Sequence, residues 1–158
     1  MALCSVQRAM TGSPARAYLR RQLEAHLDRL GYSQVRSPRA GVPIAEIARV
    51  SPVRGRLAYG QTVLHADLQQ PRCHERLLFF SQRRTRHRSS ILFFIGVAEE
   101  DQPELEALLE HLSIRNAVRG GHVHVVAISL PSTLSRQVPA PCAPVRARRV
   151  AGRVLKNA

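Results

Sequence analysis

The sequence predicts an α/β domain with a central mixed sheet flanked by helices. Leucines recur on one helical face as Leu19, Leu23, Leu27 and Leu30. The run SILFFIGVA at residues 90–98 is continuously apolar and rich in β-formers, which is typical of a strand covered on both faces. Helical and strand patterns alternate along the chain, and this alternation favours an α/β fold.

The first helix has signals at both ends. Ser13 and Pro14 stand where an N-cap and a first helical residue belong, and Gly31 ends the leucine pattern. The other expected elements are strands at residues 42–50 and 56–68, a helix at 71–84, a strand at 90–98 in the centre of the sheet, a helix from Asp101 or Gln102 through Leu112, and a half-exposed strand at 122–128.

Turn residues at 51–55 join the first two expected strands, so these strands should form an antiparallel hairpin. Gly60 inside the second strand is interpreted as a bulge. Proline, serine and basic residues dominate after Leu130 without a hydrophobic period. We therefore expect a flexible N-terminus over residues 1–12, one domain over 13–130 and a disordered basic tail over 131–158.

The charge of the chain is strongly positive and unevenly distributed. The 24 basic residues exceed the 11 acidic ones, which gives a formal net charge of +13, and Lys156 is the only lysine. Six of the acids lie within residues 99–110, where there is no lysine or arginine. This segregation favours a polyanionic partner. A GC-rich genome also explains arginine in place of lysine, but it does not explain the excess.

Several classes of protein are disfavoured by composition. The three cysteines are scattered without CxxC spacing, so neither a disulfide framework nor a cysteine zinc site is expected. The longest apolar run is far shorter than the roughly 18 residues that a membrane-spanning helix needs. We expect a cytoplasmic protein with no membrane association.

The expected order of elements over residues 13–128 resembles the restriction-endonuclease-like fold of the PD-(D/E)xK nuclease superfamily. In that superfamily, an acid from the first helix, an acid on the hairpin and a (D/E)xK triplet on the next strand gather around Mg²⁺. The resemblance places Glu24 and Glu46 at the two acidic positions and Gln61, Thr62 and Val63 at the triplet. Gln61 supplies no charge and Val63 cannot replace an ammonium group, so the resemblance implies an inactive, degenerate member.

Each acidic candidate also has a structural interpretation. Glu24 is flanked by Arg20 and Arg21 at helical spacing, so a solvated salt bridge is the favoured use. Glu46 lies among apolar residues on an expected strand. Its charged side chain must face solvent, a partner or a functional site, and a functional and a purely structural role are equally good interpretations. Asp67 is either a replacement acid displaced along its strand or an ordinary residue at a strand end, and the second reading is favoured.

Histidines suggest a possible metal site, but we assign none. His122 and His124 would place two imidazoles on one strand face, with Cys73 and His74 as imaginable companions. An exposed strand face explains the pair more simply. No cofactor is expected unless the protein is an active nuclease, which would require Mg²⁺.

The candidate nucleic-acid-binding residues are arginines in two clusters. One cluster lies just before the central strand and the other lies in the tail. They comprise Arg83, Arg84, Arg86, Arg88, Arg146, Arg148 and Arg149. Phosphate binding is the favoured reading, and the alternative is a solvated loop or a docking surface for an acidic protein.

The leading hypothesis is a non-catalytic nucleic-acid-associated module. One alternative is an active metal-dependent nuclease that uses Glu24, Glu46, Gln61 and Asp67 in a migrated motif. Another is a protein-interaction subunit or homodimer in which the acidic segment at residues 99–110 binds a basic surface.

Overall fold

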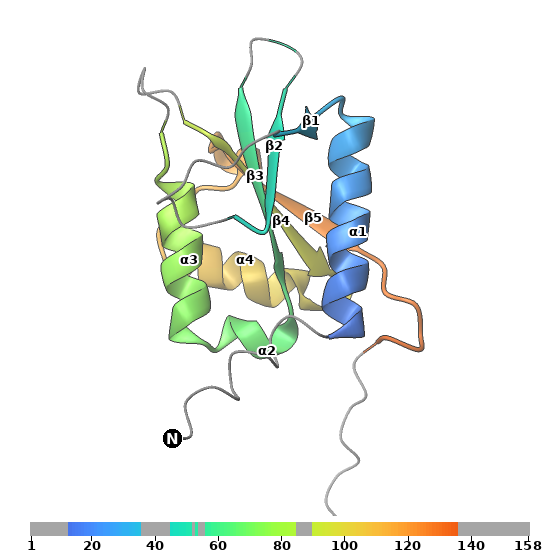
Figure 1. The fold of residues 1–158 in the computed structure, drawn as a ribbon. Helices are drawn as coiled ribbons and strands as arrows, with labels where there is room; N and C mark the ends of the chain where they lie inside the picture. The colour runs from blue at the N-terminus through green and yellow to red at the C-terminus, as the bar shows by residue number, and fades with distance from the viewer. Residues whose placement is uncertain (1–12, 36–44, 52, 54–55, 85–89, 136–158) are drawn as a thin grey trace, which may run out of the picture.

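The structure is a computed structural model, and it describes residues 13–35, 45–51, 53, 56–84 and 90–135. The N-terminal segment 1–12 and most of the predicted tail lie outside the described residues. The elements in chain order are α1 (Pro14–Arg29), β1 (Ser33–Gln34), β2 (Ile47–Val50), β3 (Leu57–Val63), α2 (His65–Leu68), α3 (Pro71–Ser81), β4 (Leu92–Ala98), the 3₁₀ turn η1 (Glu99–Asp101), α4 (Gln102–His111), the 3₁₀ turn η2 (Ala117–Arg119) and β5 (Val123–Ile128) (Figure 1).

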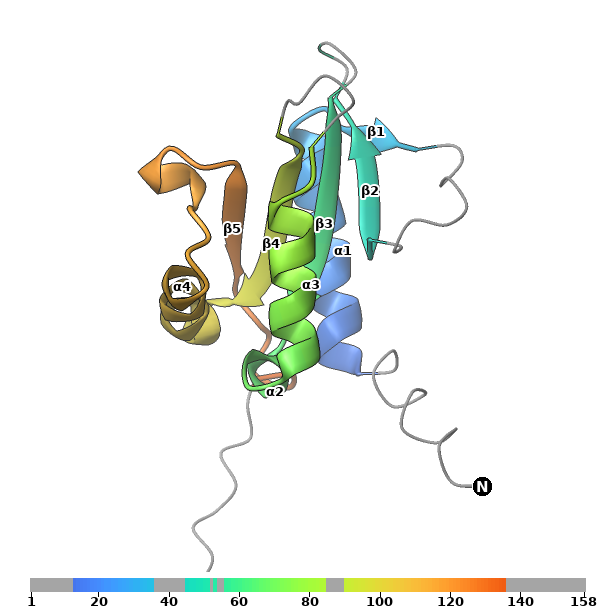
Figure 2. The same cartoon turned by 90° about the vertical axis from the view of Figure 1, so that its left-hand side faces the viewer.

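The strands form one mixed sheet in the order β1-β2-β3-β4-β5. The first three strands pair antiparallel, and β3, β4 and β5 pair parallel. Figure 2 shows this order across the sheet. The predicted α/β class, the mixed sheet and the antiparallel hairpin are confirmed for the described residues.

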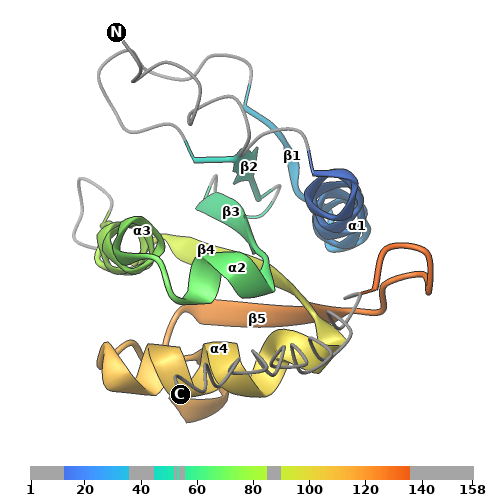
Figure 3. The ribbon, with the colours of Figure 1, turned by 90° about the horizontal axis from the view of Figure 1, so that it is seen from below.

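Two apolar cores cover the two faces of the sheet. On one face α1 buries Leu19, Leu23 and Leu27 against β2, β3 and β4. On the other face α3 and α4 pack against the sheet, as the view from below shows (Figure 3). Neighbouring residues of β4 face opposite sides, because Phe93 belongs to the α3 and α4 core and Phe94 to the α1 core. The apolar run therefore forms a strand covered on both faces, as predicted.

The second strand of the hairpin, predicted at residues 56–68, is shorter in the structure. It ends at Val63, and His65–Leu68 form the short helix α2. The carboxylate of Asp67 accepts a hydrogen bond of 2.8 Å from the backbone N–H of Leu64, which closes the first turn of this helix. The prediction is wrong here because a side chain three residues downstream stabilises helix in place of strand.

The bulge expected at Gly60 does not occur, because Gly60 pairs in continuous register with Ile47 on β2 and Phe94 on β4. A Cβ atom at Gly60 would lie 3.0 Å from the Cβ of Ile47. The glycine is needed for close packing between the strand and the core.

Two smaller differences concern helix ends, and a third is an additional strand. The leucine stripe of α1 stops at Leu27, and Leu30 is exposed at the C-cap. The helix α3 ends at Ser81, three residues before its predicted end. The two-residue strand β1 was not expected. Among the described residues, no helix has the length and apolar character to cross a membrane.

Candidate functional site at the carboxyl edge of the sheet

The parallel strands β3 and β4 end at the same edge of the sheet. After β3 the chain enters α2, and after β4 it enters η1 and α4 (Figure 1). The start of β2 lies at this edge too, because β2 runs antiparallel to β3. Open α/β sheets bind ligands outside the carboxyl ends of their strands. Most of the polar side chains considered below meet here.

Glu46 lies beside the predicted triplet. Its carboxylate accepts a 2.7 Å hydrogen bond from the backbone N–H of Thr62 and bonds of 2.7 and 2.8 Å from the Thr62 hydroxyl. The structure thus brings together the second predicted acid and the segment that the nuclease resemblance places next to it. Both oxygens of the carboxylate already accept hydrogen bonds.

Asp67 pairs with a cation from the protein itself. The Nη2 atom of Arg16 on α1 lies 2.6 Å from Oδ2 of Asp67, and Nη1 donates a 3.2 Å hydrogen bond to the carbonyl of Thr62. This guanidinium therefore connects the triplet strand with the acid proposed as a replacement ligand. A positive charge fixed at this point disfavours a metal ion on Asp67.

Glu24 belongs to a different network. It lies 3.3 Å from Arg20 on its own helix and 4.0 Å from the buried Arg49 on β2. Glu24 lies eight positions along α1 from Arg16, which is a rise of about 12 Å. The helix salt bridge favoured for Glu24 is present.

The remaining triplet positions supply no metal ligand or ammonium group. Gln61 is buried, and its Oε1 has no hydrogen-bond partner. Val63 is fully buried in the core under α3. Within the described residues, Glu24, Glu46 and Asp67 do not form a group of carboxylates spaced as metal ligands are.

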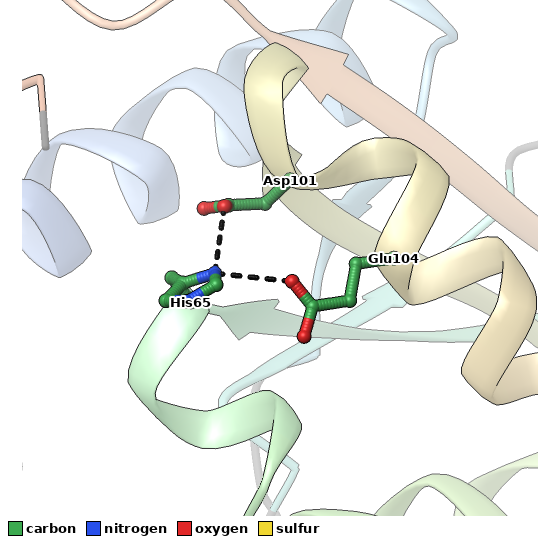
Figure 4. Close-up of side chains that lie close together, drawn as sticks. All are labelled: His65, Asp101 and Glu104. Carbon is green, nitrogen blue, oxygen red and sulfur yellow. Dashed lines mark hydrogen bonds and ion pairs between the residues drawn. The ribbon is translucent and has the colours of Figure 1, made fainter.

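A second cluster at the same edge was not predicted. Nδ1 of His65, the first residue of α2, lies 3.0 Å from Oδ1 of Asp101 and 3.2 Å from Oε2 of Glu104 (Figure 4). Nε2 of Gln69 donates a 2.9 Å hydrogen bond to the other Glu104 oxygen. His65 and Asp101 lie just after the ends of β3 and β4, and the parallel pairing of these two strands, which the sequence did not predict, brings them together.

The histidines expected on the last strand do not form a metal group with cysteine. The ring of His124 stacks on Phe94 with 4.8 Å between centroids, and His122 contacts the carbonyl of Ser81. Burial raises the pKa of the Cys73 thiol to about 11, which suppresses the metal-binding thiolate. His74 bonds the carbonyl of Leu68. The exposed-face interpretation holds only in part, because His122 and His124 are both half-buried.

The two described arginines of the first basic cluster lie at the amino edge of the sheet. The Arg83 guanidinium lies 5.1 Å from the ring centroid of Phe79. Arg84 is exposed, and its backbone forms an isolated antiparallel β-bridge with Ser90. The other predicted nucleic-acid-binding residues lie outside the described part of the chain, namely Arg86, Arg88, Arg146, Arg148 and Arg149.

Nearly all of the excess charge lies outside the described residues. The described ranges contain 12 arginines and all 11 acidic residues, so they are close to neutral. The other segments contain 12 basic residues and no acid, namely Arg8, Arg36, Arg39, Arg54, Arg86, Arg88, Arg136, Arg146, Arg148, Arg149, Arg153 and Lys156.

The fold and these clusters define a mixed-sheet α/β domain with an acidic, histidine-containing carboxyl edge. No protein-family model matches the chain, and no curated protein or solved structure is significantly similar to it.

Proposed function

We propose that this protein is a non-catalytic nucleic-acid-associated module on a degenerate restriction-endonuclease-like scaffold. The observation that carries the proposal is the charge distribution. The described residues are nearly neutral, and the remaining segments of the chain hold 12 basic residues and no acidic residue. Segments of this composition bind phosphates with little sequence preference, because phosphate contacts are electrostatic.

The attachment points of two basic segments support a common binding surface. Because β3 and β4 are parallel, the segments before them join the sheet at the same edge. One carries Arg54, and the other carries Arg86 and Arg88. Arg83 and Arg84 flank the second segment, and the bridge between Arg84 and Ser90 brings its two ends together.

The opposite edge argues against phosphodiester hydrolysis. It carries the carboxylates of Asp67, Glu99, Asp101 and Glu104. The two candidate ligand acids at this edge already have protein partners, because Glu46 accepts hydrogen bonds from Thr62 and Asp67 pairs with Arg16. The element order and the contact of Glu46 with the triplet strand support the degenerate scaffold.

Fluorescence anisotropy with labelled duplex DNA and structured RNA across a salt series tests the proposal. We expect binding at low salt that weakens steeply as salt is added, with a logarithmic slope of about −0.9 for each phosphate contacted on duplex DNA. Absence of binding at low salt, or an affinity that does not change with salt, would overturn the proposal.

Variants that remove positive charge from each cluster localise the contact, with a control that matches the first variant in the number of arginines removed. One variant carries Arg83→Gln, Arg84→Gln, Arg86→Gln and Arg88→Gln, and a second carries Arg146→Gln, Arg148→Gln and Arg149→Gln. The control removes four exposed arginines elsewhere, by Arg21→Gln, Arg72→Gln, Arg76→Gln and Arg115→Gln. We expect the first variant to reduce the slope by about 3 or 4 units and the control to change it less.

A further inference from the structure

We propose that His65, Asp101 and Glu104 bind one divalent transition-metal ion, with Zn²⁺ as the best-fitting ion. This metal site goes beyond the nucleic-acid-binding function, which does not use these residues. Nδ1 of His65, one oxygen of Asp101 and one oxygen of Glu104 all lie within 4.8 Å of one another. Their side chains converge from α2, η1 and α4 (Figure 4).

The separations match those of ligand atoms around a tetrahedral ion. Zinc bonds to imidazole nitrogen and carboxylate oxygen are about 2.0 to 2.2 Å long, so adjacent ligand atoms are about 3.3 Å apart. The distances from His65 Nδ1 to the two carboxylate oxygens are 3.0 and 3.2 Å. Small rotations of the side chains would place an ion between the three atoms.

The charges at this cluster are unbalanced without a cation. Two carboxylates face one ring nitrogen, and this nitrogen carries at most one hydrogen, which cannot be donated fully to both. Asp101 is only 5% exposed, so its charge is largely shielded from water. Within the described residues, neither carboxylate has a lysine or arginine partner. A divalent ion would replace the imidazole proton and neutralise both acids.

The cluster is held in place by its surroundings. Only Leu64 separates His65 from the end of β3, and Asp101 and Glu104 lie at the junction of η1 with α4. The Gln69 amide donates to one oxygen of Glu104 and leaves the other oxygen facing His65. Hydrogen bonds of this kind to a ligating carboxylate orient it toward the ion.

The ligand types select the metal. An imidazole nitrogen favours zinc and neighbouring first-row ions over Mg²⁺ and Ca²⁺, which prefer oxygen ligands alone. No cysteine belongs to the group. Three protein ligands leave the fourth tetrahedral position for water. The ion would link α2 to α4 at the carboxyl edge of the sheet.

Calorimetric titration of chelator-treated full-length protein with Zn²⁺ tests the site. We expect one Zn²⁺ per chain at this site and at least 10-fold weaker binding in His65→Gln and in Glu104→Gln. Matched controls are His111→Gln and Glu106→Gln, which remove the same groups from exposed positions on α4. If the site variants bind Zn²⁺ as tightly as the controls do, the proposal is wrong.

Two further measurements separate metal binding from folding and from other ligands. The rise in Tm on adding Zn²⁺ is compared within each variant, so a fold weakened by substitution still gives a readout. We expect this rise in wild type and controls and its loss in the site variants. Bound Co²⁺ should show the visible bands of tetrahedral nitrogen and oxygen ligation. A near-ultraviolet thiolate band would assign the metal to cysteine and overturn the proposal.

The Gln69→Ala variant tests the positioning of Glu104. It keeps all three ligands and removes the amide that orients the carboxylate. We expect Zn²⁺ affinity to fall by about 10-fold with unchanged stoichiometry, since a lost hydrogen-bond partner of a ligand has this effect. Unchanged affinity would show that the Glu104 carboxylate does not bind in the orientation proposed.

Discussion

Arg16 and Asp67 form an ion pair of 2.6 Å between helix α1 and helix α2. The same guanidinium donates to the carbonyl of Thr62, while the Asp67 carboxylate accepts from the N–H of Leu64. One pair of charges therefore joins the first helix, the end of β3 and the turn that follows it. Its loss should affect stability well beyond a surface salt bridge.

We predict that Arg16→Met lowers the free energy of unfolding by about 1 to 3 kcal/mol, because Asp67 would keep a largely buried charge without its cation. The partial exposure of Arg16 limits the effect. Urea denaturation measures the change, and Arg21→Met, at an exposed position on the same helix, is the control. Equal stability of the two variants would contradict this prediction.

Thr62 anchors Glu46 at the edge of the sheet. We predict that Thr62→Val costs about 1 to 3 kcal/mol of unfolding free energy, because the carboxylate loses the hydroxyl donor. Thr62→Ser keeps the hydroxyl and should retain most of this stability. Denaturation of the two variants side by side distinguishes a lost hydrogen bond from a general packing defect, which would weaken both to the same degree.

Gly60 and Gly96 provide a matched test of close packing. A Cβ at Gly60 would meet the backbone-attached Cβ of Ile47 at 3.0 Å, whereas one at Gly96 would meet the end of the Leu23 side chain at 3.2 Å. We predict a loss of about 1 to 3 kcal/mol for Gly60→Ala and a smaller loss for Gly96→Ala, since a side-chain terminus moves more easily. The opposite ranking in thermal or urea denaturation would refute this account.

His26 on α1 and His124 on β5 should make the stability of the protein depend on pH. Burial, followed by the charges of His122 and His26, lowers the pKa of His124, and burial followed by Arg29 lowers the pKa of His26. The unfolded chain binds these protons at higher pH, near 6.5. The contribution of these two histidines to the unfolding free energy should therefore be fully present above that pH. It should be lost as the pH falls through their lowered pKa values in the folded protein.

The variant His124→Gln tests this dependence in denaturation curves between about pH 7.5 and 5. We expect a shallower loss of stability on acidification than in wild type. His111→Gln, which removes an exposed histidine at the end of α4, should keep the wild-type profile. A profile that His124→Gln leaves unchanged would show that this ring does not titrate with folding.

We predict no metal-dependent cleavage of DNA or RNA above background with Mg²⁺ or Mn²⁺. Catalysis needs a metal held by several anionic oxygens. The carboxylate of Glu46 accepts a hydrogen bond from Thr62, and that of Asp67 pairs with Arg16. Glu46→Gln should leave the assay at background. Cleavage that co-purifies with the protein and disappears in this variant would support the nuclease alternative.

The sequence by itself determined the elements with a strong local signal. The leucine spacing predicted α1, and the uninterrupted apolar run predicted β4 between two covered faces. The same reasoning predicted that the strand before α2 continues through the residues that form α2. The apolar pattern could not show that the Asp67 side chain accepts a hydrogen bond from the backbone of Leu64 and starts a helix there. The spacing of apolar residues predicts which face of a segment is buried. It does not predict where a strand ends when a polar side chain caps the turn that follows.

Tertiary structure decided which polar side chains meet. The sequence placed Glu46 near the triplet through a resemblance, but only the fold paired Asp67 with Arg16 and His65 with Asp101 and Glu104. These contacts depend on the parallel pairing of β3 with β4 and on the packing of α1 over them. Residues distant in the chain become neighbours only through such pairing, because local sequence patterns carry no information about strand order or register.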